Sequence, residues 1–154
     1  MIKLPYIIQD EMTSSYKFID HTADIAFDVE AETLEELFTS AAEAWKESVL
    51  EKEVRLELTK QKKIELEAGS IEQLLVEFLS ELNFLLFTKK WLYLSLKNLS
   101  VTNENTLWKF SASMNGNEIS EQVLLKQEIK AITYHQMEIV NENSKYKTRV
   151  VFDI

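Results

Sequence analysis

The chain has 154 residues, 45% of them hydrophobic, which suits a single domain with one core. It contains no cysteine, and this excludes disulfides, thiolate metal sites and cysteine nucleophiles. Its net charge of −9 disfavours tight binding to bare RNA, because an acidic surface repels phosphates, and favours a basic partner or a metal ion. The two glycines are too few for a P-loop or a dinucleotide-binding fingerprint.

The N-terminal region shows no targeting signal. Residues 2–8 are interrupted by Lys3 and Pro5, and they lack the long apolar region and small-residue cleavage site of a signal peptide. No apolar stretch approaches the roughly 18 residues needed to span a membrane. We therefore expect a cytoplasmic protein with a short, flexible leader over 1–14 and a single domain over 15–154.

The first expected elements are two strands and a helix. Residues 16–20 have the composition of a strand, and apolar and acidic residues alternate along 24–31, as in a half-buried strand. Thr33 and Glu36 have the spacing of a capping box. Apolar residues then recur at helical spacing, which predicts a helix over 33–50.

The middle of the chain continues with strands and a second helix. Alternating patterns predict strands over 54–58 and 63–67. Ser70 and Gln73 form a second capping signal. The apolar spacing that follows predicts a second amphipathic helix over 71–82.

The remainder of the chain has the patterns of strands. They are expected over 91–101, 106–114, 128–140 and 145–154. The dipeptide at Asn115 and Gly116 is typical of a hairpin turn, and the polar tetrad 141–144 joins the last two strands. These elements predict an α+β fold of two layers: a largely antiparallel sheet with the two amphipathic helices packed on one face.

Acidic groups gather at the C-terminus. Asp153 is followed by Ile154, whose free carboxylate adds a second negative group beside it. Two adjacent carboxylates repel each other unless a cation lies between them. The simpler interpretation is a frayed end with Asp153 in water, but the apolar strand formers before it favour an end held in the sheet.

The predicted hairpin places a lysine near these carboxylates. If the tetrad closes it, Asp153 lies opposite Ile132 or Thr133, and Lys130 follows two or three residues beyond, within roughly 10 Å. A slip in register would move these side chains, and a one-residue slip would turn them to the other face. Oxygen ligands without sulfur suit a hard cation such as Ca²⁺, Mg²⁺ or Mn²⁺ better than zinc.

Histidine chemistry has little support. His21 and His135 are far apart, and His135 falls inside the predicted strand 128–140, where a hydrogen-bonded sheet histidine is the simpler interpretation. The segment that begins at His21 lies at the mouth of the second strand. On composition alone, a turn in which Asp20 or Asp24 caps backbone N–H groups is the simpler interpretation, with a functional site as the alternative.

Three segments together resemble the archease family. They are DHTADI at 20–25, IKAITYH at 129–135 and VVFDI at 150–154, and the resemblance extends over residues 16–154. Three places depart from the family pattern. Ala26 stands where a glycine is usual, Glu30-Ala31 replaces an aromatic residue followed by glycine, and Val123 falls where a histidine is usual.

The resemblance implies an accessory protein rather than an enzyme. Archeases assist the tRNA-splicing ligase that joins RNA through a 3′-phosphate or 2′,3′-cyclic phosphate end, using GTP and manganese. They speed guanylylation of the ligase and restore its multiple turnover. The ligase is thus the implied partner, with RNA contacted only through it.

The resemblance also implies a set of functional residues. Asp24, Asp153 and the terminal carboxylate of Ile154 are expected to bind a divalent metal ion, Ca²⁺ in the isolated protein or Mn²⁺ or Mg²⁺. Lys130, together with Asp24 and Asp153, is expected to serve activation of the ligase.

Two other functions stay open. An autonomous metal-dependent phosphoesterase would use the carboxylates to bind one or two metals and activate water. A small interaction module would hold a structural ion, and Asp24 and Asp153 would then serve folding rather than function.

Overall fold

The computed structural model describes residues 13–19, 24–120, 123 and 125–154. In chain order the elements are β1 (Ser14–Ile19), β2 (Asp24–Ala31), α1 (Leu34–Val49), β3 (Lys60–Ala68), α2 (Ile71–Phe87), β4 (Trp91–Glu104), β5 (Leu107–Glu118), β6 (Ala131–Ile132), β7 (Val140–Glu142) and β8 (Lys145–Asp153). Of the predicted leader, residues 1–12 lie outside this described part, and Ser14 already belongs to β1.

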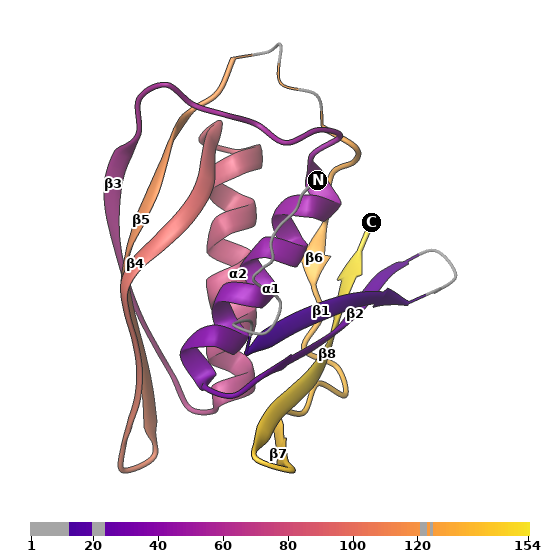
Figure 1. Ribbon diagram of the computed structural model, residues 1–154, viewed down its shortest axis with the longest axis vertical. Helices are drawn as coiled ribbons and strands as arrows, with labels where there is room; N and C mark the ends of the chain where they lie inside the picture. Colours follow the sequence, from indigo (N-terminus) through magenta and orange to yellow (C-terminus); the bar gives the residue numbers. More distant parts are fainter. Residues whose placement is uncertain (1–12, 20–23, 121–122, 124) are drawn as a thin grey trace.

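The strands form two antiparallel sheets with both helices between them (Figure 1). One sheet has the order β1-β2-β8-β6, with β7 also paired to β8, and the other has the order β3-β5-β4. The α+β class, the antiparallel pairing and the two helices are confirmed. The strands do not form the single sheet that was expected with the helices on one face. The reason is that α2 buries neighbouring residues such as Leu74 and Leu75, so its apolar surface is wide enough to contact both sheets.

Both helices begin at the predicted caps. Thr33 Oγ1 accepts a hydrogen bond from the Glu36 backbone N–H at 3.1 Å, and Ser70 Oγ accepts one from the Gln73 N–H at 3.1 Å. Each bond satisfies an N–H group that the first helical turn leaves without a partner. The predicted bounds of α1 are close to those observed, whereas α2 continues beyond the expected end to Phe87.

Three stacked or tilted phenylalanine rings join the helices to the three-stranded sheet. Phe38 of α1, Phe78 of α2 and Phe110 of β5 are each no more than 1% exposed. The ring centroid of Phe110 lies 5.5 Å from that of Phe38 and 4.5 Å from that of Phe78. Aromatic pairs at these separations stabilise a core beyond the burial of their area.

The segment 54–58 is not a strand, so this prediction is wrong. Val54 and Leu56 are half-buried while their neighbours are exposed, as the alternation predicts. The segment pairs with no strand in the described part of the chain. An alternating pattern thus identified an extended, half-buried segment but did not supply a pairing partner.

The predicted turn at Asn115 and Gly116 is also wrong, because both residues lie inside β5. A Cβ atom added to Gly116 would meet the Leu92 carbonyl oxygen and would lie 2.6 Å from an atom of the Trp91 ring. Glycine is required here because neighbouring backbone and ring approach closely. The turn of the hairpin formed by β4 and β5 lies instead at Asn105, which has a φ of 63°.

The tetrad 141–144 does close a hairpin. Glu142 pairs with Lys145, and Asn143 and Ser144 between them have φ angles of 55° and 64°, as a two-residue type I′ turn requires. The predicted strand 128–140 is wrong, because only β6 and the first residue of β7 are strand within it.

Register explains the break in this strand. The segment 133–139 faces the shorter stretch 148–151 of β8, so its extra residues leave the sheet. They form a turn at His135 and Gln136, with a φ of 60° at Gln136. His135 is therefore exposed in a turn and is not the sheet histidine that was expected.

Neither helix in the described part of the chain combines the length and the apolar character that crossing a membrane requires.

Candidate metal and partner-binding site

Two carboxylates face each other where β2 begins and β8 ends. Asp24 is the register partner of Asp153, and the next pair inward joins Ile25 to Phe152. Phe152 is 0% exposed, so alternation places the aspartate pair on the opposite face of the sheet from the core. Directly opposed residues have Cβ atoms about 4.5–5.5 Å apart, and like charges there destabilise the pair unless a cationic group lies between them.

The other side of β8 brings Lys130 to the same place. Ala131 is the register partner of Asp153, and the Lys130 backbone N–H donates to the Asp153 carbonyl oxygen at 2.8 Å. The expected register, with Ile132 or Thr133 opposite Asp153, is therefore wrong by one or two residues. Lys130 lies nearer to Asp153 than that register implied. The Thr133 N–H bonds to the Val151 carbonyl oxygen at 2.9 Å, so Thr133 lies further along β8.

A side chain of α2 fixes the backbone just before Lys130. The Asn83 amide nitrogen donates to the Ile129 carbonyl oxygen at 2.8 Å, and the Asn83 amide oxygen accepts from the Trp45 indole N–H at 3.1 Å. Sequence reasoning missed Asn83. The available signal was a lone amide between Leu82 and Phe84 in an otherwise apolar stretch of the helix.

A pocket of about 380 Å³ opens beside this segment. It is lined by Ser80, Asn83, Phe84, Phe87, Thr88 and residues 128–132. Phe84 is 44% exposed, which is unusual for so large an apolar side chain on a core helix. The surface around Lys130 thus combines a cation with exposed apolar area, a mixture found at protein–protein interfaces.

The donor set at this end of the sheet consists of oxygen atoms. Asp24 and Asp153 supply side-chain carboxylates, and Ile154, 36% exposed, carries the terminal carboxylate of this chain. Among the described residues, no group of three His, Cys, Asp or Glu side chains is arranged to hold a metal ion. Such oxygen ligands fit a hard divalent cation. Asp20 and His21 of the first motif lie outside the described residues.

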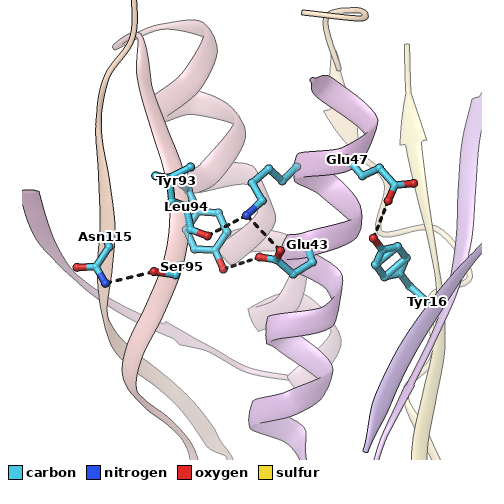
Figure 2. Close-up of polar contacts among 8 residues, drawn as sticks. Tyr16, Glu43, Glu47, Tyr93, Leu94, Ser95 and Asn115 are labelled. Carbon is cyan, nitrogen blue, oxygen red and sulfur yellow. Dashed lines mark hydrogen bonds and ion pairs between the residues drawn. The ribbon is translucent and has the colours of Figure 1, made fainter. Parts of the chain in front are cut away.

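A second polar cluster lies on α1, between the two sheets (Figure 2). Glu43 accepts a hydrogen bond from the Tyr93 hydroxyl at 3.3 Å and pairs with Lys46 at 3.1 Å. Lys46 also donates to the Leu94 carbonyl oxygen at 2.9 Å. Burial, together with the Glu43 carboxylate, raises the pKa of the Tyr93 hydroxyl well above its usual range.

A second hydrogen bond between a tyrosine and a glutamate links α1 to the five-stranded sheet. The Tyr16 hydroxyl donates to the Glu47 carboxylate at 2.7 Å (Figure 2), and burial together with Glu47 raises the pKa of Tyr16. Each of these tyrosines is held as a neutral hydrogen-bond donor. The cluster therefore links α1 to β1 and β4 and does not present a reactive group.

Fold and site together define a small α+β domain that carries an aspartate pair and a lysine at one end of a sheet. The model of the Archease protein family matches residues 16–154. The protein archease of Methanosarcina barkeri is 32% identical over 140 residues, which cover 90% of this chain and 95% of that protein. The protein archease of Archaeoglobus fulgidus is 34% identical, over 90% of this chain and 98% of that protein. The chain belongs to the archease family.

Solved structures share this fold. The solution structure of Methanobacterium thermoautotrophicum protein 1598 superposes with a TM-score of 0.74 and 30% identity, covering 90% of this chain and 98% of that one. A crystal structure from Thermotoga maritima, described as an archease and possible chaperone, shares the fold at a TM-score of 0.56 and 24% identity. It covers 90% of this chain and 96% of that one.

Proposed function

We propose that this chain is an accessory activator of the tRNA-splicing 3′-phosphate RNA ligase and has no catalytic activity of its own. In this role it promotes GTP-dependent guanylylation of the ligase and its multiple turnover. The observation that carries the proposal is the convergence of Asp24, Lys130 and Asp153 at one end of the five-stranded sheet. These residues stand in the three motifs that resemble archeases, and membership of the family supports an accessory role.

Each of these residues has a proposed task. Asp24, Asp153 and the Ile154 carboxylate hold a divalent cation, Ca²⁺ in the isolated protein or Mn²⁺ or Mg²⁺ at the ligase. When bound, the cation supplies positive charge that neutralises phosphate oxygens. The exposed Lys130 ammonium engages a phosphate as a compact point charge.

The backbone holds this end of the sheet, the tip that carries Asp24, Lys130 and Asp153, rigid in the absence of a partner. Asp153 is paired on both sides, with Asp24 on β2 and with Ala131 on β6, so its main chain is fixed within the sheet. A pre-formed tip loses less conformational entropy on binding than a flexible tail would. This favours insertion into the active site of a larger enzyme.

Guanylylation of the host's ligase with GTP and Mn²⁺, with and without this protein, tests the proposal. We expect the wild-type protein to speed guanylylation, and Asp153→Asn and Lys130→Ala to lose most of that effect. Asp28→Asn is the matched control, because Asp28 is an exposed carboxylate on β2, four residues beyond Asp24, that pairs with Arg149 at 2.8 Å. It should stimulate as the wild type does.

The outcomes separate the competing functions. No stimulation by the wild-type protein rejects the proposal, and full stimulation by both variants rejects the site. Hydrolysis of phosphoesters by the isolated protein would favour the phosphoesterase instead. Calorimetry with Ca²⁺ supplies a readout independent of the ligase: Asp24→Ala with Asp153→Ala should weaken binding, as should residues added after Ile154, whereas Asp28→Ala should not.

A further inference from the structure

The backbone around Lys130 has little regular structure to hold it in place. It precedes β6, which has two residues, and the chain between β5 and β6 forms no named helix or strand among its described residues. Upstream, the Lys126 N–H bonds to the Val49 carbonyl oxygen at 2.9 Å and the Gln127 side chain to the Ser48 carbonyl oxygen at 3.0 Å. These contacts fix the segment to the end of α1 but leave Lys130 itself to other groups.

The side-chain contact closest to Lys130 in the chain comes from Asn83. Its amide nitrogen bonds to the carbonyl of Ile129, the residue immediately before Lys130, and its amide oxygen is held by Trp45. An indole N–H can only donate and a carbonyl can only accept, so the two partners determine which way the amide points. Trp45 is 0% exposed and Ile129 is 2% exposed, so both ends of the bridge lie in the core.

We propose that Asn83 is a positioning residue for the accessory function, which sets the Lys130 backbone by tying it to the buried indole of Trp45. The inference rests on the proposed function, because it assumes that Lys130 is presented to the ligase. Asn83 is one of the two groups that fix this backbone from opposite sides. The Asp153 carbonyl holds the Lys130 N–H on the sheet side, and the Asn83 amide holds the preceding carbonyl on the helix side.

Asn83→Asp breaks this bridge selectively. A carboxylate still accepts from Trp45 but can no longer donate to Ile129, and it opposes the carbonyl with a negative oxygen. Asn117→Asp is the matched control, because the Asn117 amide likewise donates to a loop carbonyl, that of Leu58 at 2.9 Å, and accepts from a backbone N–H, that of Glu118 at 2.8 Å. Both variants add one negative charge.

Hydrogen exchange measured by mass spectrometry on peptides spanning 128–133 reports how often the Lys130 N–H is released from the Asp153 carbonyl, an opening that the bridge opposes. Asn83→Asp should speed exchange of the Lys130 amide by roughly fivefold, the factor that a typical hydrogen bond contributes. Asn117→Asp should leave these peptides unchanged. Trp45→Phe removes the indole N–H that orients the Asn83 amide, so it should also speed exchange at Lys130, but less than Asn83→Asp does, because the amide can still donate to Ile129.

Titration of the ligase with each variant reports the functional consequence. If only a fraction of molecules holds Lys130 correctly, the concentration for half-maximal stimulation rises by the inverse of that fraction while the maximum is retained. We expect that concentration to rise for Asn83→Asp by the inverse of the fraction of molecules that still hold Lys130 in place, and to stay unchanged for Asn117→Asp.

Unchanged exchange in Asn83→Asp would overturn the proposal, and so would faster exchange with an unchanged half-maximal concentration. If the wild-type protein fails to stimulate the ligase, the proposed function fails by itself and the role of Asn83 in presenting Lys130 falls with it. The exchange measurement then still decides whether Asn83 fixes the segment.

Discussion

The two sheets of this protein are built in different ways. In the three-stranded sheet, β5 pairs along nearly its whole length with both β3 and β4. In the five-stranded sheet, β8 pairs continuously with β2 on one side, but on the other side it meets only the short strands β6 and β7, with a turn between them. Long ladders thus form one sheet, whereas the candidate site lies at the end of the other, where β8 meets only the two residues of β6 on one side. Side-chain bonds to the backbone have to position the chain there.

The largest effect should come from the core that both regions share. Phe78→Ala removes a ring of α2 that is 0% exposed and packs against Phe38 of α1 and Phe110 of β5. We expect a loss of about 3–5 kcal/mol in the free energy of unfolding, because the cavity adds to the lost burial. Urea denaturation followed by circular dichroism measures it. A loss below about 1 kcal/mol would show that the phenylalanine cluster is not the centre of the core.

A smaller effect tests the regular sheet alone. Gly116→Ala places a methyl group against the Leu92 carbonyl and the Trp91 ring, so backbone or ring must shift. Overpacking of this kind costs about 1–3 kcal/mol. Gly69→Ala is the control, because a Cβ atom there meets nothing within 4 Å. Equal stability of both variants would mean that β4 can move away from β5 without cost.

The fall of stability at alkaline pH shows how strongly a tyrosine links α1 to each sheet. Burial first, and then Glu43, raise the pKa of Tyr93, so folding favours the protonated phenol. The stability that this raised pKa contributes is fully present below about pH 10, the pKa of tyrosine in the unfolded chain. As the pH rises above that value, the free energy of unfolding falls by up to about 1.4 kcal/mol per pH unit. Urea midpoints between about pH 9 and pH 11 should fall less steeply for Tyr93→Phe than for the wild type. Equal slopes would contradict this account of Tyr93.

Tyr16 supplies the counterpart in the other sheet. Its pKa is raised in the same direction by burial and Glu47, but the residue is only half-buried. Tyr16→Phe should therefore reduce the alkaline slope less than Tyr93→Phe does, because solvent screens the interaction. The reverse order would place the stronger link between α1 and the five-stranded sheet.

The smallest effect is expected at the candidate site itself. Asp153 and Lys130 are exposed, so Asp153→Ala and Lys130→Ala should change the free energy of unfolding by only about 0.5 kcal/mol. Thermal melting measures this, and the guanylylation assay shows whether function is lost at the same time. A large loss of stability in either variant would assign these residues to folding rather than to a partner.

Local signals predicted the parts of the fold that depend on local physics. The strand over 24–31 was predicted with the bounds that it has, because alternation along a half-buried strand is a property of the segment itself. The caps at Thr33 and Ser70 were correct for the same reason. The failures at 54–58 and Gly116 depend on what lies opposite in space. Segment 54–58 has no partner strand among the residues that the structure describes, and at Gly116 a ring approaches closely. No local pattern contains that information.

The site shows the same division. Asp24 and Lys130 were identified from motifs, and the hairpin predicted at 141–144 placed the last two strands side by side. The register at Asp153, however, was predicted one or two residues away from the pairing observed. The cause is the turn at His135 and Gln136, which takes up extra residues between β6 and β7. Asn83 remained hidden because its two partners come from distant parts of the chain.

The central position of β8 in its sheet affects the order in which the protein folds. β2, β6 and β7 each pair with this late strand, whereas α2 and the hairpin of β4 and β5 are close in the chain (Figure 1). Contacts between distant segments form slowly, because the loop that joins them must be closed before the contacts can stabilise it. During synthesis from the N-terminus, Asp24 is therefore made long before β8 and can pair with Asp153 only after β8 has been synthesised. The candidate site is therefore assembled only after β8 has joined the sheet, so a chain that has not yet added β8 lacks it.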